Sequence, residues 1–230
     1  MRLRSAIGRV WGADPAPDRP GQPGPRAAAP PAARGRFGAM PAWVLLPQLF
    51  LASGWLRAGI ANAVTAGWWD GAGVRTFLAE ETDLAVPFYE PVLALVESLA
   101  VPVAVVVCVA ELVIAALLLL DRWPLAALAA GAFLNVQFVV AGVVNPSAFY
   151  LVIAMVVVLW HLDHGGSAAT YRVAARAAVA AAVVATLTLA PFVSTLRPAE
   201  VIRDPALVLV FLSALFAVAV AWARRQSAAG

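Results

Sequence analysis

The stretch VAVVVCVAELVIAALLLL, residues 103–120, decides the fold of this chain. Its only charged residue is Glu111, which lies near the middle. A run of about 18 or more apolar residues is typical of a transmembrane helix, because such a helix crosses the roughly 30 Å hydrocarbon core of a bilayer. A carboxylate at that depth costs about 2.5 kcal/mol or more, so it is rarely left without a partner or a task. The stretch therefore predicts a membrane helix that carries a functional group.

The composition of the whole chain indicates a membrane protein. Of the 230 residues, 63% are hydrophobic and 13% are charged, whereas soluble domains are about half apolar and one quarter charged. Because backbone polar groups in lipid must be satisfied within their own segment, helices are the expected structure. We predict an all-α, polytopic membrane helix bundle embedded in the lipid bilayer. The basic residues suit membrane orientation better than nucleic-acid binding, and no nucleic-acid partner is expected.

Six apolar segments follow a beginning that is rich in proline and arginine. Residues 1–42 hold eight prolines and seven arginines and cannot bury a core, which predicts a disordered, basic cytoplasmic tail. The apolar segments cover residues 43–63, 103–120, 124–143, 146–162, 173–196 and 206–222. The first four form a predicted core at residues 43–163, with short helices expected in an outward loop at 64–102. Residues 164–230 add two transmembrane helices and a short cytoplasmic tail.

The arginines are distributed unevenly between the two sides of the predicted membrane. If the tail is cytoplasmic, twelve of the 16 basic residues lie inside, and only Arg75, Arg197 and Arg203 lie outside. This distribution satisfies the positive-inside rule. It predicts a multi-pass protein of the bacterial cytoplasmic membrane with both termini in the cytoplasm.

Glu111 has one candidate partner of opposite charge within the membrane. Arg57 lies in the first segment, LPQLFLASGWLRAGIAN, residues 46–62. At a rise of about 1.5 Å per residue the two depths differ by several ångströms, which a forked guanidinium contact can span. We predict that Arg57 and Glu111 form a catalytic pair. The residues predicted to bind a substrate or a quinone beside this pair are Asn135, as an orienting hydrogen-bond group, and Trp55 and Trp69, as pocket lining.

Such a buried polar pocket, opening outward, suits a quinone headgroup, a proton or a small anion. A positioned carboxyl group can supply one of the protons that quinone reduction requires. The same polar residues can instead serve only as contacts that hold helices together. We expect no bound metal, because His161 and His164 have no third ligand near them in sequence, and no flavin, because the chain has no glycine-rich nucleotide motif.

Four short motifs between residues 46 and 160 share the pattern of a known family. The first is LPQLFLASGWLRAGIAN, and the second is the aromatic loop with Trp69, Phe77 and Pro87-Phe88-Tyr89. The third is Ala110-Glu111-Leu112 before LLLL and Asp121-Arg122, and the fourth is Asn135, Val139-Val140-Ala141-Gly142 and Asn145-Pro146. With these motifs the chain resembles the DoxX-like membrane proteins and, within them, the DoxD type. Asn62 stands where family members often carry a lysine, and Ala110 where they often carry a glycine.

The resemblance implies a four-helix membrane core, to which the last two segments are an addition. It also implies a subunit of a quinone-linked oxidoreductase of the thiosulfate:quinone oxidoreductase type. Quinone is then the electron acceptor, thiosulfate is oxidised to tetrathionate, and the partner is a DoxA-like or other redox subunit.

Two alternatives from other functional classes stay open. A non-catalytic membrane scaffold for partner redox proteins would tolerate Glu111→Gln. A small transporter would move its substrate across the membrane without any quinone.

Overall fold

The computed structural model describes residues 40–165, 167–197 and 200–229. Every regular element within these ranges is a helix, and the predicted all-α class is confirmed. The predicted tail at residues 1–42 lies outside the described residues except for its last three positions.

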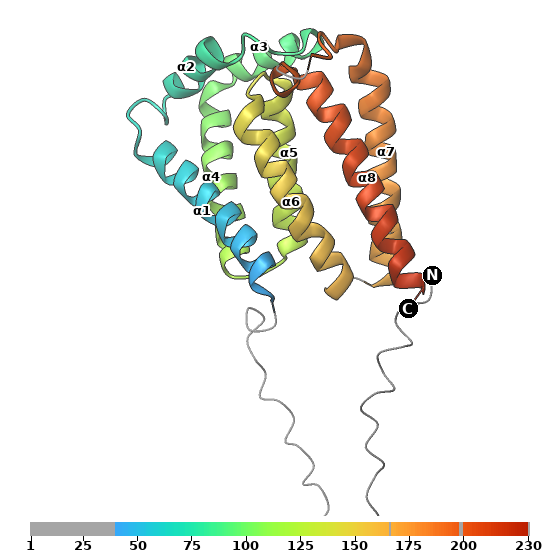
Figure 1. Ribbon diagram of the computed structural model, residues 1–230. Coiled ribbons are helices and arrows are strands. Elements are labelled where there is room, and N and C mark those ends of the chain that lie inside the picture. Colours follow the sequence, from blue (N-terminus) through green and yellow to red (C-terminus); the bar gives the residue numbers. More distant parts are fainter. Residues whose placement is uncertain (1–39, 166, 198–199, 230) are drawn as a thin grey trace, which may run out of the picture. The chain divides into compact units, whose positions relative to one another are not determined.

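Five of the described helices are long and apolar enough to cross a membrane. They are α1 (Ala42–Val64), α4 (Ala100–Leu119), α6 (Val144–Gly165), α7 (Ala168–Leu189) and α8 (Pro205–Ala229). The remaining predicted segment, residues 124–143, forms α5 (Pro124–Val140), whose 17 residues extend about 25 Å at 1.5 Å per residue. The chain is thus a multi-pass membrane protein whose predicted apolar segments all form helices. These helices lie side by side (Figure 1).

Three shorter helices lie at one end of the bundle, in the segment where the sequence predicts them. They are α2 (Ala72–Glu81), η2 (Pro87–Tyr89) and α3 (Glu90–Ser98). We call this the upper end, as it is drawn in Figure 1, and the opposite end, where α1 begins and α8 ends, the lower end. Two further short helices, η3 (Ala190–Phe192) and η4 (Val201–Arg203), join α7 to α8.

The segment between α2 and η2 is fixed to the end of α5. The backbone N–H of Val86 donates to the carbonyl of Val140 at 3.0 Å. Gly142 permits this approach, since its φ is 104° and a Cβ there would lie only 3.0 Å from the backbone nitrogen of Ala85. A side chain at this position would be strained by the left-handed backbone as well as by the contact. The segment between α2 and η2 is therefore attached to the end of α5 by a backbone hydrogen bond.

A buried polar network joins three segments at the lower end. Gln48 is fully buried, and its Nε2 donates to the carbonyl of Leu118 at 3.0 Å and to Oδ1 of Asp121 at 3.3 Å. His161 Nε2 lies 2.9 Å from Gln48 Oε1. Because the amide oxygen can only accept, His161 must carry its proton on Nε2. One glutamine thereby links α1, the turn after α4 and α6.

Candidate functional site

The carboxylate of Glu111 has its hydrogen-bond partner on α1. Asn62 Nδ2 donates to Glu111 Oε2 at 2.7 Å, and Glu111 is only 4% exposed. The two helices approach closely here because residue 59 is glycine: a Cβ there would lie 2.8 Å from Leu112 Cδ2 and 3.3 Å from Glu111 Cβ. Cys108 Sγ also lies 3.4 Å from the Gly59 carbonyl oxygen. A missing side chain on α1 thus allows an amide to reach a carboxylate on α4.

Helical periodicity explains why these residues meet. The buried positions of α4 are Ala100, Ala104, Cys108, Glu111, Ile114, Ala115 and Leu118. They recur every three or four residues, as one face of a helix does. On α1, Trp55 and Gly59 are buried with the same spacing, and Asn62 follows three residues later. Glu111 therefore belongs to the face of α4 that packs against other helices, not to the face exposed to lipid.

A cavity of about 520 Å³ adjoins this pair in the upper half of the bundle. Its walls come from α1, α4 and α5, and residues of α2 and α3 also line it. The lining is mostly apolar, and its polar members are Asn62, Trp68, Tyr89, Glu111 and Gln137. Ligand pockets commonly measure 300–1,000 Å³ and combine apolar walls with a few placed polar groups. By size and lining, this cavity is the candidate ligand site.

A second polar pair lines the same cavity. Tyr89 Oη donates to Gln137 Oε1 at 2.5 Å, which leaves the N–H groups of Gln137 outside the described hydrogen bonds. Burial raises the pKa of Tyr89 above its ordinary value of 10.0, so its phenol keeps its proton at neutral pH. The indole N–H of Trp68 donates to the backbone carbonyl of Ala104 at 3.0 Å, so Trp68 is not part of either polar side-chain pair. The cavity thus offers two separate polar pairs, one on α1 and α4 and one on η2 and α5.

The predicted ion pair between Arg57 and Glu111 is wrong. Arg57 is exposed, and the described partner of Glu111 is Asn62. Arg57 lies two residues from each of Trp55 and Gly59, which are buried. At about 100° per residue it points about 200° away from both. The prediction compared the depths of the two charges without comparing their helix faces.

The other predicted site residues lie outside the lining of this cavity. Asn135 is buried, but its Nδ2 donates to the carbonyl of Gly131 in its own helix at 2.9 Å. Trp55 packs beside the same glycine, where a Cβ would lie 3.2 Å from the indole nitrogen. Trp69 is 48% exposed, and its indole N–H donates to the Ala63 carbonyl at 2.9 Å. Of the predicted residues, the structure brings only Glu111 to the cavity.

Sequence reasoning missed four of the five polar residues that line the cavity. Gln137 lies two residues from Asn135, the residue that was predicted instead, and Tyr89 appears only within a family motif. Trp68 lies next to the tryptophan that was chosen. Asn62 could have been identified from the sequence, because it lies seven residues after Trp55 and therefore shares its helix face.

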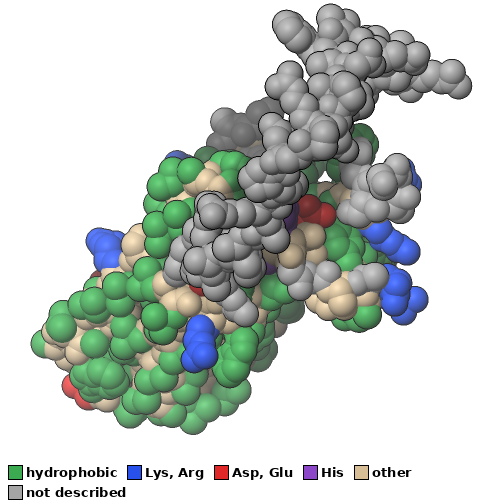
Figure 2. Space-filling model, turned by 90° about the horizontal axis from the view of Figure 1, so that it is seen from below, with side chains coloured by type: hydrophobic (Ala, Val, Ile, Leu, Met, Phe, Trp, Pro, Cys, Tyr) green, Lys and Arg blue, Asp and Glu red, His purple; other side chains and the backbone are tan. Residues whose placement is uncertain are grey.

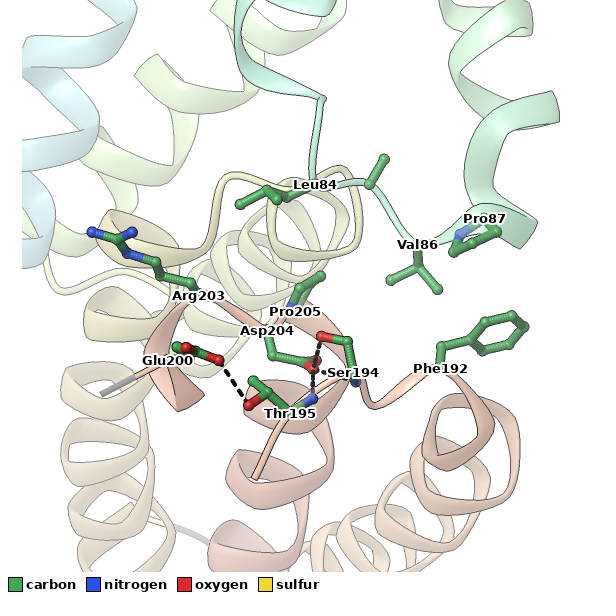
Figure 3. A pocket seen from close by; sticks show the side chains of 11 residues that line it. Leu84, Val86, Pro87, Phe192, Ser194, Thr195, Glu200, Arg203, Asp204 and Pro205 are labelled. Carbon is green, nitrogen blue, oxygen red and sulfur yellow. Dashed lines mark hydrogen bonds between the residues drawn. The ribbon is translucent and has the colours of Figure 1, made fainter. Parts of the chain in front are cut away.

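A second pocket, of about 440 Å³, lies at the upper end beside the connection from α7 to α8. Asp204 is buried there and accepts hydrogen bonds from the backbone N–H groups of Ser194 and Thr195, from the Ser194 hydroxyl and from the Leu207 N–H at the start of α8. Figure 3 shows Asp204 facing Ser194 and Thr195. Burial alone raises the pKa of Asp204, but these hydrogen bonds outweigh it and leave the pKa below its ordinary value. Asp204 therefore acts as a helix cap that fixes the connection.

The fold and the cavity together define a class: a multi-pass helical membrane protein with a buried carboxyl group in an apolar chamber. Comparisons of the chain with protein-family models, curated proteins and solved structures give no match.

Proposed function

We propose that this protein binds a quinone headgroup in the cavity beside Glu111 and is the membrane subunit of a quinone-linked oxidoreductase. One observation carries the proposal: an apolar chamber of about 520 Å³ holds two separate polar pairs, Asn62–Glu111 and Tyr89–Gln137. A quinone is an apolar ring with two carbonyl oxygens on opposite sides. Each oxygen needs a hydrogen-bond donor, and the second N–H of Asn62 and the N–H groups of Gln137 are suitable donors.

Glu111 has a chemical role in this proposal. Reduction of a quinone to a quinol takes up two electrons and two protons. Glu111, hydrogen-bonded to Asn62 and lining the cavity, is placed to deliver one proton to a reduced oxygen and to regain it afterwards. The second proton and both electrons come from outside this chain. Oxidation of two thiosulfate ions to one tetrathionate releases the required two electrons.

The resemblance to DoxD-type proteins supports thiosulfate as the electron source and a DoxA-like subunit as the partner. The arginine distribution supports the bacterial cytoplasmic membrane, with both termini inside. The upper end, and with it the cavity, then faces away from the cytoplasm. Thiosulfate is a divalent anion that does not cross a bilayer freely, so a redox partner docked at this end suits the oxidation of external thiosulfate.

The test is thiosulfate-dependent reduction of a short-chain quinone by membranes that contain the protein with its natural partners. We expect Glu111→Gln to lower the rate at least tenfold, since it keeps the shape and the Asn62 contact but removes the proton donor. Glu97→Gln is the matched control, because Glu97 is an exposed glutamate on α3 that does not line the cavity, and it should leave the rate unchanged.

The rival functions give different results in the same experiment. A scaffold predicts full quinone reduction with Glu111→Gln and loss of activity only when the chain is deleted. A transporter predicts movement of a solute into sealed vesicles that contain no quinone. Either result would overturn the proposed function.

A further inference from the structure

We infer that the lower end of the α7–α8 pair binds the headgroup of an anionic phospholipid through Arg176, Arg224 and Arg225. This inference is independent of the proposed function. The three arginines line a groove of about 660 Å³ together with Ala175, Val179, Ala180 and Ala221. Three positive charges thus border a surface of small apolar side chains, and no carboxylate is among the lining residues.

The packing of α7 against α8 creates this groove. α7 and α8 are antiparallel neighbours joined by a short connection (Figure 1). The Tyr171 hydroxyl donates to the Val220 carbonyl at 3.3 Å, which links the two helices near the lower end. This packing places Arg176, near the beginning of α7, and Arg224 and Arg225, near the end of α8, along one groove. Arginines about 50 residues apart in sequence therefore border one groove.

These guanidinium groups have no anionic partner in the part of the chain that the structure describes. The two salt bridges found there are His164–Asp163 and Arg197–Glu200, and none of the described side-chain hydrogen bonds uses Arg176, Arg224 or Arg225. Other basic side chains also mark the rim of the lower face (Figure 2). What distinguishes this groove is the convergence of three arginines from two helices.

The position of Arg176 on α7 suits contact with an anion at the membrane surface. Arg176 lies seven residues after Ala169, where the stretch of α7 that is long and apolar enough to cross a membrane begins, and seven residues of helix extend about 10 Å. An arginine at that depth extends its side chain towards the headgroups, where phosphate can accept two parallel hydrogen bonds from one guanidinium. Basic pockets between transmembrane helices are recognised sites for anionic headgroups.

The apolar surface above the arginines suits a lipid rather than a free anion. Only 11% of the membrane-spanning window of α7 is buried, against 28–33% in the other four helices. Val179, Val183, Val184 and Leu187 are exposed along it. Acyl chains can cover these side chains while the phosphate contacts the arginines. A free phosphate ion would use the charges and leave this surface uncovered.

The inference is tested by native mass spectrometry of the full chain, purified in neutral detergent and titrated with phosphatidylglycerol. We expect one tightly bound lipid per chain, with phosphatidylcholine at least tenfold weaker. The double variant Arg176→Gln/Arg224→Gln should weaken phosphatidylglycerol binding at least tenfold, because it removes two basic groups from the phosphate. The variant Arg176→Lys/Arg224→Lys should retain most of it, because the charge remains.

The matched control is Arg122→Gln, which removes an exposed arginine at the same end of the bundle but outside the groove. It should change the affinity less than twofold. Equal binding of the two lipids, full affinity in the double glutamine variant, or an equal loss with Arg122→Gln would overturn the inference. Displacement of the lipid by millimolar inorganic phosphate would also overturn it, because it would identify a simple anion site.

Discussion

Asn62 donates a hydrogen bond of 2.7 Å to Glu111, 49 residues further along the chain. In a membrane a buried carboxylate is costly, and this amide provides the hydrogen bond that the predicted arginine was expected to provide. We predict that Asn62→Leu destabilises the protein by about 1–3 kcal/mol, because it leaves a buried acceptor unpaired. Thermal or denaturant unfolding in detergent measures this loss.

Arg57→Gln is the control for that experiment. Arg57 is exposed on the opposite side of α1, so this variant should unfold within about 0.5 kcal/mol of the wild type. If Arg57→Gln destabilised the protein as much as Asn62→Leu, the assignment of Asn62 as the partner of Glu111 would be wrong.

The close approach of α1 and α4 depends on Gly59. A Cβ at this position would lie 2.8 Å from two atoms of Leu112, so Gly59→Val must push the helices apart or displace that leucine. Overpacking of this kind costs about 1–3 kcal/mol. We expect a lower melting temperature together with weaker ligand binding, since Asn62 moves away from Glu111. Ala61→Val, at an exposed position of the same helix, should change neither measurement.

Gln48 holds the lower end together. Replacing it with leucine removes the donor to the Leu118 carbonyl and the acceptor for His161. Because these groups stay buried without partners, we expect a loss of about 1–3 kcal/mol in the free energy of unfolding. The contribution of the histidine can be tested separately. His161→Phe in the Gln48→Leu background removes the unpaired imidazole, so the double variant should recover part of the lost free energy of unfolding. A fully additive loss in the double variant would show that the two side chains do not act together.

Asp204 predicts a specific dependence of stability on pH. Its native pKa lies below the ordinary value because four hydrogen bonds favour the carboxylate despite burial. A lowered native pKa stabilises the folded state above the unfolded pKa of about 3.9, and this stabilisation is lost as the pH falls through the native value. Asp204→Asn should therefore destabilise the protein by about 1–2 kcal/mol at pH 6 and by less at pH 3. A difference between the two proteins that stays constant over this range would contradict the assignment.

Much of the fold could be predicted from sequence because long apolar runs have a direct physical meaning. The run around Glu111 can be a stable structure in lipid only as a helix, and the same holds for the other segments. The short helices at the upper end were expected within the outward loop at residues 64–102. The start of α7 at Ala168 was missed, although Ser167 caps it by accepting a hydrogen bond from the Thr170 N–H at 3.1 Å.

The site was harder to predict because it depends on helix rotation and on which helices pack together. Opposite charge favoured Arg57 as a partner, yet the spacing of Trp55, Gly59 and Asn62 defines the buried face of α1. Hydropathy says little about rotation here, because lipid-facing and buried positions are both apolar. The spacing of polar residues such as Gln48 and Asn62 indicated the buried face of α1 better than the position of its charged residue did.

The central claim is that the cavity beside Glu111 binds a quinone, and direct binding tests it most simply. Isothermal titration of the purified protein with a short-chain quinone should give one site per chain. Gln137→Leu should weaken binding about fivefold or more, because it removes one of the two donors assigned to the quinone oxygens, while Glu97→Gln binds like the wild type. Undetectable binding to the wild type, or equal affinity of the wild type and Gln137→Leu, would contradict the account.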